Sequence, residues 1–414
     1  MVVFLSSCED KTIERYKVAS PVYLSYEDLR ASVKTATSIP EIQQPGKIYF
    51  YNDYIFINEY QKGVHVIDNS DPSSPQTVTF INIPGNVDIA IKNDILYADS
   101  YVDLVVIDIS DLNNVIERNR IIDAFPYTIP EINSNLRIDA VDETKGVVVA
   151  WEEKEVEVVV ENNNYYNMYP VYAFEDAMIS NTARSVSAAP GGSYGVGGSM
   201  ARFTIYKNVL YVINDYNLNL FDIGDPDNPE ICGSQYIGWN IETLFPYEKK
   251  LFIGSSSGMF IYDIQNPKEP TYISSYSHVS SCDPVVVNGN YAYVTLRSGN
   301  ECAGYTDQLD VVDLNNISNP ELLETYPMYN PHGLGIDNNT LFICDGDSGL
   351  KVYDVTDPLN IDKNLITQFN DINAFDVIPL DDVLMLIGQD GFYQYDYSDL
   401  DNIQLLSTVI ILNN

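Results

Sequence analysis

The chain has 414 residues and a large excess of acid, with 59 aspartates and glutamates against 22 lysines and arginines, for a net charge of −37. A field of this sign repels phosphate backbones, which excludes a nucleic-acid-binding protein. No apolar run has the length of a membrane-spanning helix, so any membrane contact is expected through an attached lipid.

The N-terminus carries a candidate lipidation site at Cys8. The run Val2-Val-Phe-Leu-Ser-Ser-Cys8 resembles the end of a bacterial lipoprotein signal, although the basic segment of a complete signal is missing. A cysteine buried or incidental near the terminus is the alternative. The acidic pair Glu9-Asp10 resembles a surface-export signal, and residues 9–30 are expected to form a polar tether. These features predict a lipid-anchored protein of a bacterial outer membrane or cell surface.

From residue 46 onward the chain repeats one phrase, a short run rich in Val, Ile, Leu and Tyr that ends on aspartate. The copies end at Asp68, Asp108, Asp222, Asp263, Asp313, Asp354 and Asp396. Their spacing of about 40 to 50 residues, with one wider gap, is typical of four-stranded propeller blades. Within the gap, residues 138–161 hold a worn copy, in which Glu161 replaces the aspartate.

Eight copies predict an all-β fold, a β-propeller with eight four-stranded blades. Seven blades, with the worn copy lost to an insertion, is the alternative. At the usual blade length eight copies need roughly 340 residues, so we expect one propeller domain over residues 31–414, after a signal remnant (1–8) and the tether (9–30). An insertion is expected at about 162–199.

The repeated aspartates are interpreted as turn formers. Each follows a predicted third strand, and five of the seven precede a turn with Pro, such as Asp71-Pro72 or Asp225-Pro226. A short acidic side chain bonds the local backbone, and Pro presets φ. An acid that recurs in nearly every copy is therefore expected to be structural rather than catalytic.

The phrases resemble the LVIVD repeat, found in β-propeller proteins common in Bacteroidetes. Leu104-Val-Val-Ile-Asp108 nearly spells the name, and His65-Val-Ile-Asp-Asn69 and Pro331-His-Gly-Leu-Gly335 are also similar. The resemblance covers about residues 46–408. It implies a propeller, often a lipoprotein, and no activity that could be carried over to individual residues.

Cys282 and Cys302 are predicted to form a disulfide. They flank the first two strands of one copy, and in an antiparallel meander these two ends lie at the same edge. Cys232 and Cys344 lie in strand-like runs and are expected to be buried free thiols. No Cys-x-x-Cys or His-x-x-x-His pair indicates zinc, and neither a metal nor a cofactor is expected.

Polar residues open the first strand of every copy. Because propellers place this strand innermost, these residues are expected to surround one mouth of the central channel: Lys47, Asp88, Asp139, Arg202, Glu242 or Thr243, Asp283, His332 and Asp376. Arg297 is expected on the same face, with residues 59–62 and 100–101. Side chains that are merely solvated at a wet mouth are the alternative.

The glycine-rich segment 189–198 is expected on this face too, as a flap or as unstructured chain. It lacks the Lys-Ser/Thr ending of a phosphate loop. The insertion that contains it carries Tyr165, Tyr166, Tyr169 and Tyr172.

Together these observations predict a non-catalytic cell-surface scaffold that binds an extracellular protein, a glycan or a small molecule at the channel mouth. The alternative is an extracellular hydrolase or lyase in which His332 acts with Asp283 and Asp376, because a histidine beside acids can serve as a general base.

Overall fold

A computed structural model of the protein describes residues 12–132, 136–160, 195–277, 284–299 and 306–411. The chain divides into two compact units. The first combines residues 1–31 with 126–180, and the second combines 32–125 with 181–414. Across the described ranges, no helix has both the length and the apolar character needed to cross a membrane.

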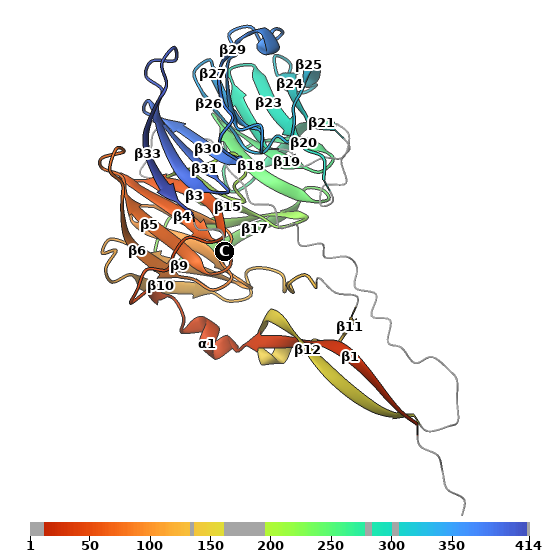
Figure 1. Ribbon diagram of the computed structural model, residues 1–414. Coiled ribbons are helices and arrows are strands. Elements are labelled where there is room, and N and C mark those ends of the chain that lie inside the picture. Colours follow the sequence, from red (N-terminus) through yellow and green to blue (C-terminus); the bar gives the residue numbers. More distant parts are fainter. Residues whose placement is uncertain (1–11, 133–135, 161–194, 278–283, 300–305, 412–414) are drawn as a thin grey trace, which may run out of the picture. The chain divides into compact units, whose positions relative to one another are not determined.

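The first unit contains a three-stranded sheet. Its elements are β1 (Thr12–Leu24), α1 (Tyr26–Arg30), β11 (Arg137–Ile138), η1 (Glu143–Lys145) and β12 (Val147–Val160) (Figure 1). The order is β11-β1-β12, with β1 antiparallel to β12 from Thr12 opposite Val160 to Leu24 opposite Val147. The described part of the predicted tether is therefore a strand and a helix, because residues 12–24 find a partner strand far away in sequence.

The worn copy takes a different form from the other copies. Its two runs at 146–150 and 156–161 were expected as separate strands, but β12 continues through both. The segment between them, Trp151-Glu-Glu-Lys-Glu155, contains none of the Gly, Asn, Asp or Pro residues that make a tight turn. An uninterrupted strand of this length pairs with β1 instead of folding back on itself.

The second unit contains seven sheets built on the same four-stranded meander, which we call blades and number in chain order (Figure 1). Blade 1 contains β3 (Pro45–Tyr51), β4 (Tyr54–Glu59), β5 (Gly63–Asp68) and β6 (Gln76–Asn82). Blade 2 contains β7 (Ile89–Lys92), β8 (Ile95–Ser100), β9 (Asp103–Asp108) and β10 (Ile116–Ile121). Blade 3 contains β14 (Phe203–Tyr206), β15 (Val209–Ile213), β16 (Asn217–Asp222) and β17 (Glu230–Tyr236).

The remaining blades follow the same plan. Blade 4 contains β18 (Ile241–Tyr247), β19 (Lys250–Ser255), β20 (Gly258–Asp263) and β21 (Thr271–Ser277). Blade 5 contains β22 (Val285–Asn288), β23 (Tyr291–Leu296), β24 (Gln308–Asp313) and β25 (Glu321–Pro327). Blade 6 contains β26 (Leu334–Asp337), β27 (Thr340–Cys344), β28 (Leu350–Asp354), η2 (Ile361–Lys363) and β29 (Leu365–Phe369). Blade 7 contains β30 (Ala374–Leu380), β31 (Val383–Gly388), β32 (Gly391–Asp396) and β33 (Gln404–Ile410). Two short strands, β2 (Lys34–Thr35) and β13 (Val196–Gly197), extend blade 1 to six strands.

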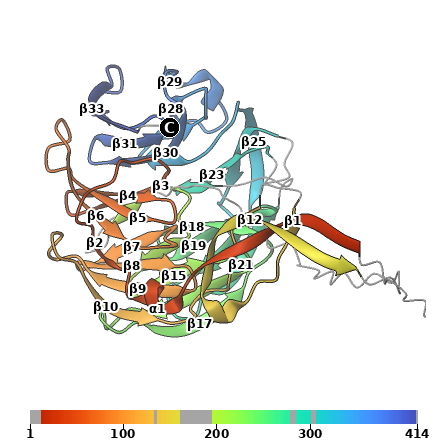
Figure 2. The same ribbon diagram turned by 60° about the horizontal axis from the view of Figure 1, so that its bottom comes forward.

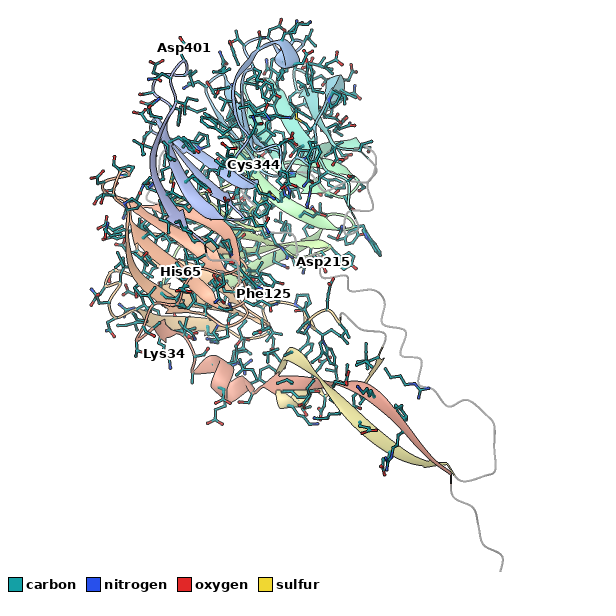
Figure 3. The ribbon with its side chains drawn as sticks, viewed as in Figure 1. Lys34, His65, Phe125, Asp215, Cys344 and Asp401 are labelled. Carbon is teal, nitrogen blue, oxygen red and sulfur yellow. The ribbon has the colours of Figure 1, made fainter. Side chains whose placement is uncertain are left out.

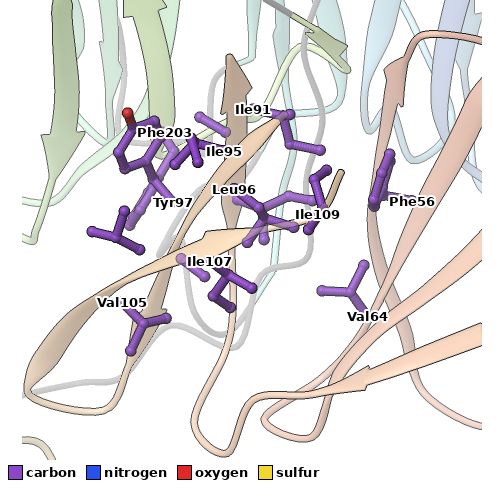
Figure 4. Packing of buried hydrophobic residues seen from close by; sticks show 14 of the residues in the cluster. Phe56, Val64, Ile91, Ile95, Leu96, Tyr97, Val105, Ile107, Ile109 and Phe203 are labelled. Carbon is purple, nitrogen blue, oxygen red and sulfur yellow. The ribbon is translucent and has the colours of Figure 1, made fainter. Parts of the chain in front are cut away.

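The blades follow one another around a common axis (Figure 2). The inner strands touch in the order β3, β7, β14, β18, β22, β26 and β30, and β31 returns to β3, so the ring is closed. Apolar side chains fill the spaces between blades; Phe56 and Val64 of blade 1, Ile91 of blade 2 and Phe203 of blade 3 belong to one buried cluster (Figure 4). The predicted propeller class is confirmed. The described residues contain eight sheets, in keeping with eight copies, and seven of them form this closed ring.

The repeated aspartates are turn formers, as expected. In all seven copies of the ring, Oδ1 of the aspartate accepts a hydrogen bond from the backbone N–H two residues later, for example from Ser70 to Asp68 at 3.0 Å and from Ser398 to Asp396 at 2.9 Å. The bond closes a local turn after the third strand.

Of the two cysteines expected to be buried, only Cys344 is. Cys232 is exposed, because it lies in the outer strand β17 at a register shift, where Leu220 pairs with Gly233 and Phe221 pairs with Ile231. Cys282 and Cys302 lie outside the described residues, as does Cys8.

Hydrogen bonds join neighbouring blades. Tyr97 of blade 2 donates to the carbonyl of Pro226 in blade 3, and Tyr211 of blade 3 donates to that of Pro267 in blade 4. At the closure between blades 7 and 1, Nε2 of the buried Gln394 lies 2.7 Å from Oδ1 of Asn69 and 3.1 Å from the carbonyl of Pro72. No strand of the described ring is shared between these two blades, so side-chain bonds and apolar contacts alone hold the closure.

Replacing Gln394 with Ala should destabilise the ring by about 1–3 kcal/mol, because Oδ1 of the buried Asn69 loses its donor, whereas the carbonyl of Pro72 keeps the hydroxyl of Ser407. Urea unfolding followed by circular dichroism measures the change. Gln404→Ala is the matched control, since its amide is exposed and bonds only to neighbouring residues. Equal losses in the two variants would contradict a special role for the closure.

Stability should also fall in acid. The backbone N–H of Ser70 lowers the pKa of Asp68, and the hydroxyls of Thr356 and Ser398 lower the pKa of Asp354 and of Asp396. A pKa below the unfolded value of about 3.9 stabilises the fold above that pH, and the contribution disappears as pH falls through the folded pKa. Asp396→Asn should therefore be less stable than the parent at pH 7, and the difference should shrink as the pH falls through the folded pKa of Asp396. Urea unfolding at a series of pH values tests this, and a constant difference would contradict it.

Candidate functional site

The two ends of the ring differ in the connections that they carry. We call one end the loop face; it holds the loops between second and third strands and the connections that lead into the inner strands. The backbone N–H of Gln61, in the first such loop, donates to the carbonyl of Asn86 in such a connection at 2.9 Å, which places the two kinds of segment together. The opposite end, the turn face, holds the turns that follow the repeated aspartates.

Residues 195–201, which we call the plug, run through the channel within the ring. Gly195 N donates to the carbonyl of Ile91 in β7, and Val196 pairs with Phe50 in β3. Farther along, Leu334 N of β26 donates to Oγ of Ser199, and Leu244 N of β18 donates to the carbonyl of Ala201. The plug therefore bonds to four blades on different sides of the channel.

The plug corrects the expectation for the glycine-rich segment 189–198. Its described part, from Gly195, is an ordered strand inside the channel rather than a flap over the loop face. A Cβ on Gly195 would lie 2.3 Å from Cε1 of Tyr49 and 2.5 Å from the carbonyl oxygen of Phe50. Glycine is required because the plug backbone passes directly over Tyr49. Residues 189–194, like the four tyrosines of the insertion, lie outside the described part of the chain.

Lys47 and Asp88 form a buried ion pair beside the plug. Oδ2 of Asp88 also accepts the backbone N–H groups of Arg202 at 2.6 Å and Phe203 at 2.9 Å. The aspartate thus links blades 1, 2 and 3 where the chain returns to the ring. The ion pair and the hydrogen bonds offset the free-energy cost of removing the charge of Asp88 from water.

Three further members of the predicted set, Thr243, His332 and Asp376, are also buried. His332 is 7% exposed, and its ring lies 5.2 Å from that of Phe375. The backbone of His332 bonds to Cys344, whose thiol has a pKa raised by burial and by the charges of Asp376 and Asp345.

The remaining described members divide between the two units. Arg202, Glu242 and Arg297 are partly exposed on the loop face. Asp139 belongs to the first unit, next to β11, where it accepts a hydrogen bond from Oγ of Ser20 at 3.1 Å. Asp283 lies outside the described residues. In the part of the chain that is described, no group of His, Cys, Asp and Glu has an arrangement suited to a metal ion.

Comparisons with known proteins agree with the repeat. Three segments, residues 46–82, 85–122 and 281–327, match the LVIVD repeat family. These three segments therefore carry LVIVD repeats. The first two matches cover blades 1 and 2, and the third covers the described strands of blade 5. No curated protein matches the chain.

Solved structures with similar folds cover nearly the whole LVIVD-repeat chain. A protein from Lactobacillus plantarum is 12% identical, with a TM-score of 0.52, over 89% of this chain and 97% of its own. The computationally designed Ika8 protein is 10% identical, with a TM-score of 0.51, over 90% and 89%. Kluyveromyces lactis Hsv2 is 11% identical, with a TM-score of 0.49, over 91% and 100%. At these identities the likeness concerns the fold alone.

One set of structural acids in the LVIVD-repeat ring was not predicted. Glu59, Asp99 and Asp345 end the second strand, or lie next to its end, in blades 1, 2 and 6. Each accepts two successive backbone N–H groups of the segment leading into the inner strand. Burial opposes ionisation of Glu59, but the nearby His65, whose Nε2 lies 3.7 Å away, and the hydrogen bond from the backbone N–H of Gln43 lower its pKa to about 2. Burial raises the pKa of Asp99 to about 6. In the sequence, these acids could have been found from the recurrence of Asp or Glu at the end of the second strand in several copies.

A second unpredicted feature is a group of aromatic side chains on the loop face, Tyr216, Tyr236 and Trp239, which we call the aromatic platform. The rings of Tyr216 and Trp239 meet edge to face, with centroids 5.5 Å apart. Trp239 is 65% exposed and Tyr236 is 67% exposed. Next to them Arg202 pairs with Asp215, which Figure 3 labels, at 3.7 Å.

Gly195→Ala should destabilise this LVIVD-repeat protein by about 1–3 kcal/mol, because the added methyl group overpacks the contact with Tyr49. Gly233→Ala is the control; its Cβ would meet only the side chain of Leu220, at an ordinary 3.9 Å from Cδ1 and 4.0 Å from Cβ. Calorimetric unfolding measures both. If Gly195→Ala unfolds like the parent, the plug does not pack as described.

Proposed function

We propose that this protein is a non-catalytic binding scaffold of the bacterial cell surface, and that the loop face of its ring contacts a macromolecule, either a protein or a glycan. The repeated propeller fold supports a scaffold role, because rigid strands hold many loops on one face. The contact would include the partly exposed Arg202, Glu242 and Arg297.

The plug is the observation that carries this proposal. Small ligands of a propeller would enter a solvent-filled channel, but here the channel holds residues 195–201, bonded to four blades. Lys47, Asp88 and His332 are buried as well. What the loop face offers to a partner is its rim of loops, a broad surface of the kind that macromolecular partners cover.

Burial also bears on the alternative of a hydrolase. A general base must reach the proton that it removes. The imidazole of His332 is nearly buried and packs against Phe375. This arrangement supports a structural role for His332, and no described contact favours catalysis.

Lipidation of Cys8 would place the scaffold at the membrane. One diacyl-bearing cysteine anchors a protein without a transmembrane helix, and the acidic surface adds no attraction to anionic lipid. The proposal therefore includes an outer-membrane or cell-surface location reached through this anchor, with no cofactor.

The test compares binding by the full chain and by two triple variants, using a glycan array and an array of purified extracellular bacterial proteins. The triple variant Arg202→Ala, Glu242→Ala and Arg297→Ala should lower the affinity for any captured partner by about tenfold or more. Charges at the rim of an interface steer the approach of the partner and fix its orientation. Lys207→Ala with Glu248→Ala and Lys249→Ala removes the same charges from exposed turns of the turn face and should leave binding unchanged. The proposal would be contradicted if the parent bound nothing on both arrays, or if the two triple variants lost affinity equally.

A further inference from the structure

The aromatic platform is held rigidly on the loop face. Its connection between blades 3 and 4 is bonded at both ends, by Ile237 N to the carbonyl of Tyr216 at 3.0 Å and by Ile241 N to that of Asp215 at 3.1 Å. A third bond joins Ser256 N to the carbonyl of Asn240, also at 3.0 Å. Trp239 is therefore presented by ordered backbone, so little conformational entropy would be lost when a partner covers it.

Few aromatic side chains of the described ring are strongly exposed to solvent. Among the described residues, the strongly exposed aromatic side chains are Tyr236, Trp239, Tyr272 and Tyr329. Trp239 and Tyr329 lie in connections of the loop face and Tyr236 ends the outer strand β17 at that face, whereas Tyr272 lies at the start of an outer strand near the turn face. Trp and Tyr, with the adjacent Arg202, are the residue types that dominate binding energy at protein interfaces.

Charge indicates the chemistry of the partner. Asp215 is 42% exposed beside the platform, and Glu242 follows Trp239 by three residues. The exposed acids Asp347, Asp371 and Asp390 lie in loops of the same face. With a net charge of −37, the chain as a whole attracts cations over long distances and repels anions.

We propose that the aromatic platform docks a basic protein segment, with a lysine or arginine of the partner lying over Trp239 and paired with Glu242, or with Asp215 in place of Arg202. Cation–π contact is strongest on Trp and is more common with Arg than with Lys, and carboxylates beside the ring supply the countercharge. This inference rests on the proposed binding function and names its partner as basic protein rather than glycan.

Tryptophan fluorescence gives a direct test, because the chain contains only Trp151 and Trp239. In full-length Trp151→Phe, Trp239 is the single reporter, and circular dichroism verifies the fold. Titration with a deca-arginine peptide should change its emission saturably. A deca-glutamate peptide should cause no change. Binding should weaken steeply with added salt, as expected for a charged contact.

A matched pair of variants separates the platform from the general acidity of the chain. By fluorescence anisotropy of labelled deca-arginine, Trp239→Ala should raise Kd by about tenfold or more, and Tyr272→Ala should leave it within about twofold. Asp215→Asn with Glu242→Gln should also weaken binding. Equal effects of Trp239→Ala and Tyr272→Ala, or an unsaturable signal, would overturn the inference.

The two proposals can fail separately. Capture of a glycan that depends on Arg202, Glu242 and Arg297, with no specific deca-arginine binding, would overturn the basic partner and leave the scaffold intact. If the parent captured no partner through the loop face on either the glycan array or the protein array, the scaffold function itself would be overturned.

Discussion

Packing of each blade between two neighbours is the interaction on which the rest of the second unit depends. A four-stranded sheet with apolar side chains on both faces is stable only when both faces are covered. Buried clusters continue from blade to blade, including one that joins Ile48 and Ile57 of blade 1 to Met385 and Phe392 of blade 7. Because the ring closes without a shared strand, Gln394 and this cluster hold its first and last blades together.

Closure of the ring creates a channel, and the plug determines the environment of its polar residues. With residues 195–201 in place, Asp88 is buried but receives Lys47 and two backbone N–H groups. A charge in the interior requires such partners. In the proposed scaffold, a partner would therefore contact the loops that carry Arg202, Trp239 and Glu242.

Features governed by local contacts were predictable. Asp68 and its counterparts form turns because each bonds a group two residues away, and the propeller class follows from the regular spacing of these turns. The prediction of buried Cys344 also held, since it ends a run of apolar residues. Cys232 is exposed because a register shift in an outer strand turns it to solvent, which depends on the pairing of β16 with β17. The sequence indicated which residues open the inner strands but not their exposure: Arg202 and Glu242 lie on the loop face, whereas Lys47, Asp88 and His332 are internal.

The sequence by itself determined the repeat, the strand-and-turn order within each copy and the acidity of the chain, because these depend on neighbouring residues and on composition. Only the tertiary structure decided which copies close the ring, where the glycine-rich segment lies and which aromatic side chains remain exposed. Residues 147–160 pair with residues 12–24, and Gly195 packs on Tyr49, through contacts between segments more than a hundred residues apart. Such pairings are selected by the burial of whole surfaces, and no local pattern of residues encodes them.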